Sequence, residues 1–158
     1  MRNTILRIAS AIALLLTLNA CRTANPDAPA LAAMNAAIHS EKPGNYFIAR
    51  RMYKVDYKFW GWIRQPGKPW TTARLVMLNE QTKLAPDREH GKLGIDNNHV
   101  YRFTGRFSGE TVYEPASDAF YPEFVLTGYE LIATKPESIY ITKSQEDPAV
   151  RILVPPVH

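Results

Sequence analysis

The sequence predicts a mostly β domain, a small barrel of five or six strands preceded by one helix. Two observations support this fold class. Between residues 46 and 133, apolar and polar residues alternate in several short runs that are separated by glycine bends and turn-forming residues, as in small barrels. Only residues 27–42 place apolar residues at helical spacing. A chain of 158 residues fits one domain, and a small β-sandwich is the alternative architecture.

The predicted helix comes before the first strand. Asp27 suits the N-cap position and Pro29 suits the first helical turn. Three apolar side chains then recur at helical spacing among alanines: Leu31, Met34 and Ile38. A Pro-Gly pair ends the pattern. Because this apolar stripe is thin, we expect the helix to dock along a single edge, as a lid.

The first predicted strand is long and runs from Tyr46 to Arg64, with Gly61 as a bulge or bend. Its alternation gives one side five apolar residues that we expect in the core: Tyr53, Val55, Tyr57, Phe59 and Ile63. The other side carries two tryptophans among cations: Lys54, Lys58, Trp60, Trp62 and Arg64. A register shifted by one residue would bury these charges, which is why this orientation is favoured.

Further extended segments follow. Residues 71–79 are the second predicted strand, and the run of apolar residues within it suggests burial on both faces. Residues 99–107 alternate again, with Tyr101, Phe103 and Phe107 expected inward, and residues 110–113 continue or restart this strand. The intervening segments 80–98 and 114–122 are predicted loops. The last apolar segments are residues 123–133, 138–142 and 151–154.

This order of elements is similar to that of an OB-fold. The long, bent first strand would form a hairpin with the second, and the segments VYRFTGRF and FVLTGYELI resemble the later strands. The resemblance covers most of residues 46–133 and implies a small barrel. It rests on pattern, without a diagnostic motif. It departs from the family in one respect, because residues 80–98 show no clear helix between the third and fourth strands.

The N-terminus has the pattern of an export signal. Arg2 and Arg7 provide positive charge, and residues 8–18 form an uncharged apolar run. This run is shorter than the roughly 20 residues that a membrane span needs, but it suits the core of a signal peptide. It ends in Leu18-Asn19-Ala20-Cys21, which resembles the lipobox of bacterial lipoproteins.

The lipobox resemblance implies cleavage before Cys21 and acylation of that residue. Two or three acyl chains are enough for stable membrane anchoring. We therefore expect a signal peptide (1–20), an anchor with a linker and the helix (21–44), and a barrel-like domain (45–158). The resemblance places the protein in the cell envelope and, in a Gram-negative cell, at the periplasmic face of the outer membrane. The alternative is an ordinary signal peptide cut near Ala20.

The best candidate site is the basic-aromatic side of the first strand, with Trp70 nearby across the turn. Residues 42–74 hold eight Lys or Arg and one acid, whereas residues 75–158 hold eight Lys or Arg and twelve acids. Aromatic rings among cations can stack on sugars or bases, and a pair of exposed tryptophans can anchor a protein partner. The alternative is that the helix covers these rings, since tryptophan is mostly buried.

The expected partners follow from the predicted export. They are the membrane, through Cys21, and an envelope glycan or protein, through the residues Trp60, Trp62, Trp70, Lys54, Lys58 and Arg64. Nucleic acid is not expected outside the cytoplasm. We favour a binding or structural module over an enzyme, and we expect partial exposure of the Trp60/Trp62 pair.

Other chemistries have weaker signals. Residues 87–99 collect Asp, Glu and His, but their spacing matches no EF-hand or zinc motif, so no metal is expected. The chain has no G-x-S-x-G motif and its single cysteine is the predicted lipidation site, so no catalytic residue or cofactor is assigned. Asp118 and Glu123 flank Phe120-Tyr121 and could form the carboxylate pair of an envelope hydrolase, which is the alternative function.

Replacing Cys21 by Ser tests the predicted anchor. Cys21→Ser removes the sulfur that acylation requires, so we expect the variant to stay unprocessed or to move to the soluble fraction. Fractionation of cells, with immunodetection in each fraction, measures this. If the variant is found with membranes in the same processed form as the unchanged chain, the anchoring hypothesis is wrong.

Overall fold

The structure is a computed structural model, and it describes residues 27–158. The predicted signal peptide and Cys21 lie outside the described residues, so the lipid anchor stays a prediction. Within the described part, no helix has the length and apolar character that a membrane crossing requires.

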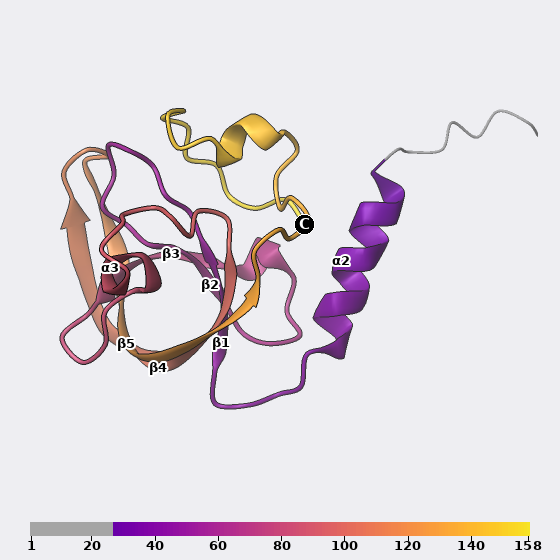
Figure 1. Cartoon of the computed structure of the whole chain (residues 1–158), viewed down its shortest axis with the longest axis horizontal. Helices are drawn as coiled ribbons and strands as arrows, with labels where there is room; N and C mark the ends of the chain where they lie inside the picture. Colours follow the sequence, from indigo (N-terminus) through magenta and orange to yellow (C-terminus); the bar gives the residue numbers. More distant parts are fainter. Residues whose placement is uncertain (1–26) are drawn as a thin grey trace, which may run out of the picture.

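Five strands close into a barrel, which confirms the predicted fold class (Figure 1). They are β1 (Phe47–Arg51), β2 (Gly61–Arg64), β3 (Arg74–Asn79), β4 (Val100–Glu114) and β5 (Ala119–Ala133). Around the barrel the order is β1-β2-β3-β5-β4, and β4 pairs again with β1. The pair β3 and β5 is parallel and the other four pairs are antiparallel. This arrangement is an OB-like barrel.

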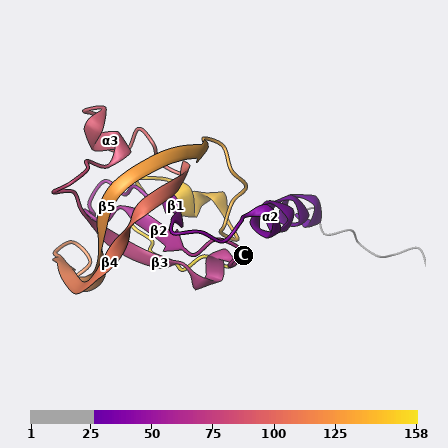
Figure 2. The same ribbon diagram turned by 90° about the horizontal axis from the view of Figure 1, so that it is seen from below.

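The predicted helix is present as α2 (Ala28–Ser40), which lies beside the barrel (Figure 2). Asp27 occupies the N-cap position and a proline lies in the first turn, as predicted. Met34 and Ile38 are its only buried side chains, and Leu31 is half-buried. The thin stripe therefore docks along one edge.

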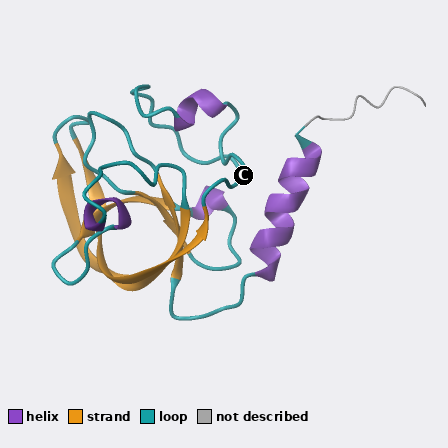
Figure 3. Ribbon diagram, viewed as in Figure 1, coloured by secondary structure: helices purple, strands orange, loops and turns teal. Residues whose placement is uncertain are grey.

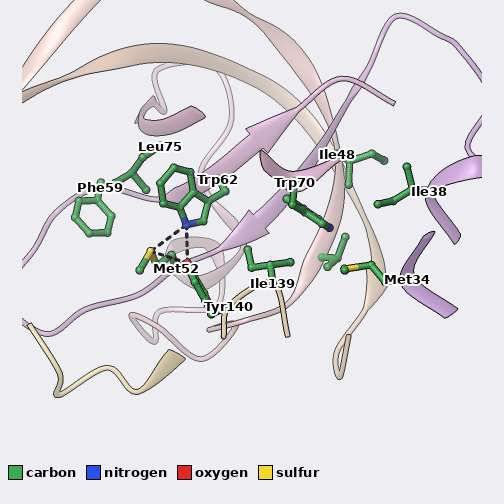
Figure 4. Close-up of a cluster of buried hydrophobic side chains, with 11 residues drawn as sticks. Met34, Ile38, Ile48, Met52, Phe59, Trp62, Trp70, Leu75, Ile139 and Tyr140 are labelled. Atoms are coloured by element: carbon green, nitrogen blue, oxygen red, sulfur yellow. Dashed lines mark hydrogen bonds between the residues drawn. The ribbon is translucent and has the colours of Figure 1, made fainter. Parts of the chain in front are cut away.

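Two clusters of buried side chains hold the fold together. One fills the barrel, where aromatic and aliphatic residues from all five strands meet, including Tyr101 and Phe103 as predicted. The other lies outside the barrel wall, beneath α2 and the segment that follows β5. Figure 4 shows this outer cluster, with Met34 and Ile38 of α2 at one side and Ile139 and Tyr140 of the C-terminal segment below it.

The predicted long first strand is wrong, because the chain turns back within it. β1 ends at Arg51, β2 begins at Gly61, and residues 52–60 form a loop between them. The amide of Met52 donates to the carbonyl of Trp60 at 3.0 Å and closes this loop. Of the five expected core residues, Phe59 and Ile63 are buried, Tyr53 and Tyr57 are half-buried, and Val55 is 63% exposed.

Lys54, expected in water, is buried inside this loop. Its Nζ donates to the carbonyls of Gln145 and Asp147, each at 2.7 Å. Burial lowers the pKa of Lys54, and the charges of Asp147 and Glu146 offset part of this effect. The turn has no glycine or proline to mark it; a contact about ninety residues away along the chain stabilises it instead.

Other element predictions also need correction (Figure 3). The segment predicted as a loop without a helix contains a short helix, α3 (Pro86–Glu89). The predicted loop 114–122 is a tight turn, because β4 and β5 form one long hairpin. The second predicted strand begins with a 3-10 helix, η1 (Trp70–Thr72), and β3 buries only Leu75 and Val76. Residues 138–142 and 151–154 are irregular, and the 3-10 helix η2 (Lys143–Glu146) lies between them.

Gly61 allows β1 and β2 to lie close together. A Cβ at this position would lie 2.1 Å from the carbonyl oxygen of Arg50, a backbone atom that cannot move aside. We expect Gly61→Ala to lower the free energy of unfolding by about 1–3 kcal/mol or more. Gly128→Ala is the control, since its nearest neighbour would be Thr104 at 3.7 Å. Urea denaturation compares the two variants, and equal midpoints would contradict the close-approach role.

Candidate functional site

The three tryptophans of the predicted basic-aromatic side are buried, so the expected exposure of Trp60 and Trp62 is wrong. Their exposed fractions are 3% for Trp60, 8% for Trp62 and 3% for Trp70. Trp60 lies inside the barrel, where its ring centroid is 4.6 Å from that of Phe103. Trp62 and Trp70 belong to the outer cluster. The side chains of Trp60 and Trp62 thus lie in different clusters.

Different parts of the chain cover Trp62 and Trp70. The indole Nε1 of Trp62 donates to the hydroxyl of Tyr140 at 2.6 Å and contacts the sulfur of Met52 at 3.2 Å (Figure 4). The C-terminal segment therefore covers Trp62. Trp70 packs in the cluster that α2 completes, and the guanidinium of Arg64 lies 4.4 Å from its ring centroid.

The three predicted cations, Lys54, Lys58 and Arg64, also lie in different surroundings. Arg64 is buried and donates to both carboxylate oxygens of Glu41, each at 2.6 Å. Lys54 is buried against backbone carbonyls, as described above. Lys58 is the only one of the six predicted residues that is exposed. Arg64 and Trp70 line a pocket beneath α2, whereas Trp60 and Lys58 line a separate cleft.

That cleft, which we call the aromatic cleft, has a volume of about 400 Å³ and opens at one end of the barrel. Loop 52–60 forms one wall, and the end of β3 with α3 forms the other. Its apolar and aromatic lining is Tyr53, Val55, Tyr57, Phe59, Trp60, Leu78, Ala85 and Leu93. Its charged lining is Arg51, Lys58, Glu80, Asp87 and Arg88. The volume lies within the range of about 300–1,000 Å³ that is usual for ligand sites.

Arg51 forms the floor of the aromatic cleft. Its Nη2 lies 2.6 Å from Asp87 Oδ2 and its Nε lies 3.2 Å from Asp96 Oδ1, and both acids are buried. Its Nη1 donates to the carbonyls of Trp60 at 2.7 Å and Phe59 at 3.3 Å. One guanidinium thus joins the loop, α3 and the segment before β4, and this fixes the shape of the cleft.

Two buried carboxylates share this one guanidinium. Burial raises the pKa of Asp96; the charge of Arg51 opposes this and the charge of Asp87 adds to it. The pKa of neighbouring Tyr101 is also raised, first by burial and then by Asp96. When both acids are ionised, the cluster of Arg51, Asp87 and Asp96 carries a net negative charge. Arg51 lowers the electrostatic cost of burying the two carboxylates.

The walls of the aromatic cleft are fixed by local contacts. Tyr57 stacks on Phe59 with ring centroids 5.2 Å apart and an interplanar angle of 20°. Across the cleft, Arg88 Nη2 lies 3.3 Å from Glu80 Oε2, and Glu80 accepts the backbone amide of Ala85 at 2.8 Å. These contacts hold both walls of the cleft in the structure without a ligand.

A second cleft, the basic groove, opens at the turn between β2 and β3 and has a volume of about 510 Å³. Its lining is Phe47, Ile63, Arg64, Gln65, Lys68, Thr72, Arg74 and Phe107. Three of these residues are cations and none is an acid. The guanidinium of Arg74 lies 4.6 Å from the ring centroid of Phe107. The predicted residue Arg64 thus lines the basic groove and is not part of the aromatic cleft.

The acids of the hydrolase alternative lie outside both clefts. Asp118 accepts a hydrogen bond from the hydroxyl of Tyr113 at 2.8 Å in the β4–β5 turn, and Glu123 accepts one from the side-chain amide Nδ2 of Asn79 at 3.1 Å. This placement adds no support to that alternative. Within residues 27–158, no three His, Cys, Asp or Glu side chains gather as metal ligands would.

The sequence reasoning missed the floor of the aromatic cleft. Arg50-Arg51 directly follows the apolar pair Ile48-Ala49 in a predicted strand, and this was the available signal. Charges at buried strand positions require acidic partners, and residues 87–96 supply them.

Comparisons with protein-family models, curated proteins and solved structures find no match to this chain. Its function is therefore inferred from its own residues.

Removing Arg51 leaves Asp87 and Asp96 buried without their cation. We expect Arg51→Met to lower the free energy of unfolding by about 3–5 kcal/mol at neutral pH. The pKa of Asp96, already raised in the folded state, rises further without Arg51. An acid with a raised folded pKa destabilises the fold above that pKa, and the penalty shrinks as pH falls through it. The deficit should therefore be smaller at mildly acidic pH.

Arg102→Met is the control for this variant. Arg102 pairs with Glu130 at 2.7 Å on the exposed outer side of the barrel, and an exposed pair contributes about 0–1 kcal/mol. Urea denaturation of both variants at neutral and mildly acidic pH is the measurement. A deficit for Arg51→Met that matches the control, or that grows toward acid, would contradict the role given to Arg51.

Proposed function

We propose that this chain is a binding module of the cell envelope, anchored through lipid on Cys21, whose aromatic cleft binds an envelope glycan. The observation that carries this proposal is the combination of aromatic walls with a fixed, charged floor in one preformed cleft. Preformed clefts with a few convergent polar groups are the usual form of a binding site.

The chemistry of the lining favours a sugar. A sugar ring has apolar C–H faces, which pack on aromatic rings, and hydroxyl groups, which need donors and acceptors. The half-buried rings of Tyr53 and Tyr57 offer the first, while Lys58, Arg88 and Glu80 offer the second. The lining holds three cations and two acids, a net charge of +1. A neutral or weakly anionic glycan fits this charge.

The position of the cleft supports the same ligand class. In OB barrels, the loop between the first two strands is one of the elements that bind oligosaccharides and oligonucleotides. Here that loop, residues 52–60, forms one wall of the cleft. The likeness is one of fold and carries no function alone. The predicted export favours a glycan over nucleic acid.

The predicted anchor would keep the cleft near a membrane. Six residues, 22–27, separate Cys21 from the start of α2 at Ala28. Fully extended, this linker spans at most about 25 Å. The barrel would therefore stay close to the membrane surface, within reach of the glycans that adjoin it.

Truncating Tyr57 tests the cleft. We expect Tyr57→Ala to weaken binding to purified cell-wall sacculi about tenfold, because one stacking surface is lost. Co-sedimentation of the detergent-solubilised protein with sacculi measures the affinity, and soluble oligosaccharide serves as competitor.

Leu131→Ala is the control, since Leu131 is an exposed apolar residue outside the cleft, on the barrel part of β5. It should bind sacculi like the unchanged chain. The glycan proposal is wrong if the unchanged chain fails to sediment, or if both variants lose binding equally.

A further inference from the structure

The β4–β5 hairpin continues beyond the barrel as an arm, residues 108–122 (Figure 3). β1 pairs with β4 only at residues 100–103, and β3 pairs with β5 only at 123–125. The arm therefore pairs only with itself. Two aromatic residues face solvent on it: Phe120 is 67% exposed and Tyr113 is 46% exposed. They are cross-strand partners with ring centroids 5.2 Å apart.

The tip of the arm is rigid. The buried carboxylate of Glu114 accepts the amide of Ser117 at 2.7 Å and its hydroxyl at 2.8 Å. On the inner side, the ring of Tyr121 lies 5.7 Å from that of Phe59 in loop 52–60. The hairpin thus holds its exposed aromatic pair in place, as the central residues of protein interfaces are held.

The arm is acidic. Residues 108–122 contain Glu110, Glu114 and Asp118 and no lysine or arginine. Glu110 and Asp118 are exposed on the same arm as the aromatic pair. The arm therefore suits a partner surface that combines cations with an aromatic floor.

The basic groove has this complementary chemistry. Phe47 and Phe107 form an aromatic floor, and their ring centroids lie 5.7 Å apart. Lys68 and Arg74 are exposed at the rim, and neither forms an ion pair within residues 27–158. No acid lines the groove.

We propose that the basic groove of one copy binds the arm of a second copy of this chain. Phe120 would pack on the phenylalanine floor with Asp118 beside Lys68 and Arg74, and Glu110 adds to the negative charge of the arm. Burial of the exposed rings drives the contact, and complementary charge gives it orientation.

A copy cannot fill its own groove. Its arm is held against loop 52–60, which precedes β2, whereas the groove lies at the turn that follows β2. The arm directly follows Phe107, which lines the groove, but the contact of Tyr121 with Phe59 holds it against loop 52–60, and neither Tyr113 nor Phe120 lines the groove of its own copy. Because the arm and the groove are different surfaces, the contact is head-to-tail, and it forms a ring or an open chain of copies instead of a closed dimer.

The contact is small, so we expect it to be weak between free copies. Confinement to one membrane raises the effective concentration of the partners and favours assembly. This last step relies on the proposed anchor at Cys21. The arm-groove contact itself does not depend on the anchor or on the aromatic cleft.

Engineered cysteines test the contact in the whole chain as expressed in the envelope. Thr72 lines the groove, and Thr111 is exposed on the arm, on the same side of β4 as Tyr113. We expect the double variant Thr72→Cys/Thr111→Cys to form a ladder of disulfide-linked dimers, trimers and longer species under oxidation. Each single variant should give no species longer than a dimer, because one engineered sulfur cannot link two neighbours.

Charge changes test which surfaces meet. Glu110→Lys with Asp118→Asn, added to the double-cysteine variant, should reduce the ladder about tenfold. Asn tolerates the positive φ of 49° at residue 118. Adding Lys68→Glu and Arg74→Glu should restore part of the ladder, since residue 110 and the groove then carry exchanged signs while residue 118 is neutral. Phe120→Ala should also reduce it, with an unchanged urea midpoint because the ring is exposed.

The proposal is overturned if the double-cysteine variant gives no species longer than a dimer. It is also overturned if the amount of longer species is the same with and without the charge changes. Tyr57→Ala, the variant of the aromatic cleft, should leave the ladder unchanged. Failure of self-association and failure of glycan binding are therefore distinguishable.

Discussion

The buried contact of Arg51 with Asp87 and Asp96 is the interaction on which both the fold and the candidate site depend. It fastens loop 52–60 and α3 to the end of β1, three segments that form no regular sheet with one another. A buried charge cluster is a poor source of net stability, because desolvation offsets most of the attraction. Its effect here is positional: the hydrogen bonds of the guanidinium hold these segments together in the arrangement described. The same contact therefore sets the register at the end of β1 and the floor of the aromatic cleft.

The sequence pattern was sufficient for the barrel and for α2 because both depend on short-range periodicity. Alternation at residues 99–107 placed Tyr101 and Phe103 in the core, and the spacing of Met34 and Ile38 defined the docking edge of α2. The turn at residues 52–60 could not be predicted in this way. It contains no glycine or proline, and the carbonyls that receive Lys54 come from the other end of the chain. Alternation continued through the turn by coincidence, and a hairpin therefore resembled one long strand.

The same long-range contacts explain why the basic-aromatic side was misjudged. Cations beside tryptophans were expected to require water, but Arg64 meets Glu41 and Lys54 meets backbone carbonyls. Because these cations have hydrogen-bond partners inside the protein, the tryptophan rings beside them can also be buried. Of the residues predicted for the site, Trp60 and Lys58 line the aromatic cleft. The acids that complete that cleft are in a polar segment whose burial no local pattern indicates.

The aromatic cleft and the basic groove lie toward opposite ends of the short strand β2. Under the two proposals, one chain would hold a glycan and a second copy at the same time. A single small cleft binds a sugar weakly, because few atoms are buried and association costs several kcal/mol of lost motion. A head-to-tail row of copies would present many such clefts to one long glycan. Linked sites gain affinity through effective concentration, without any new contact at each site. Self-association through the arm would thus convert a weak module into a tight one, and only where the polymer is long enough to span neighbouring copies.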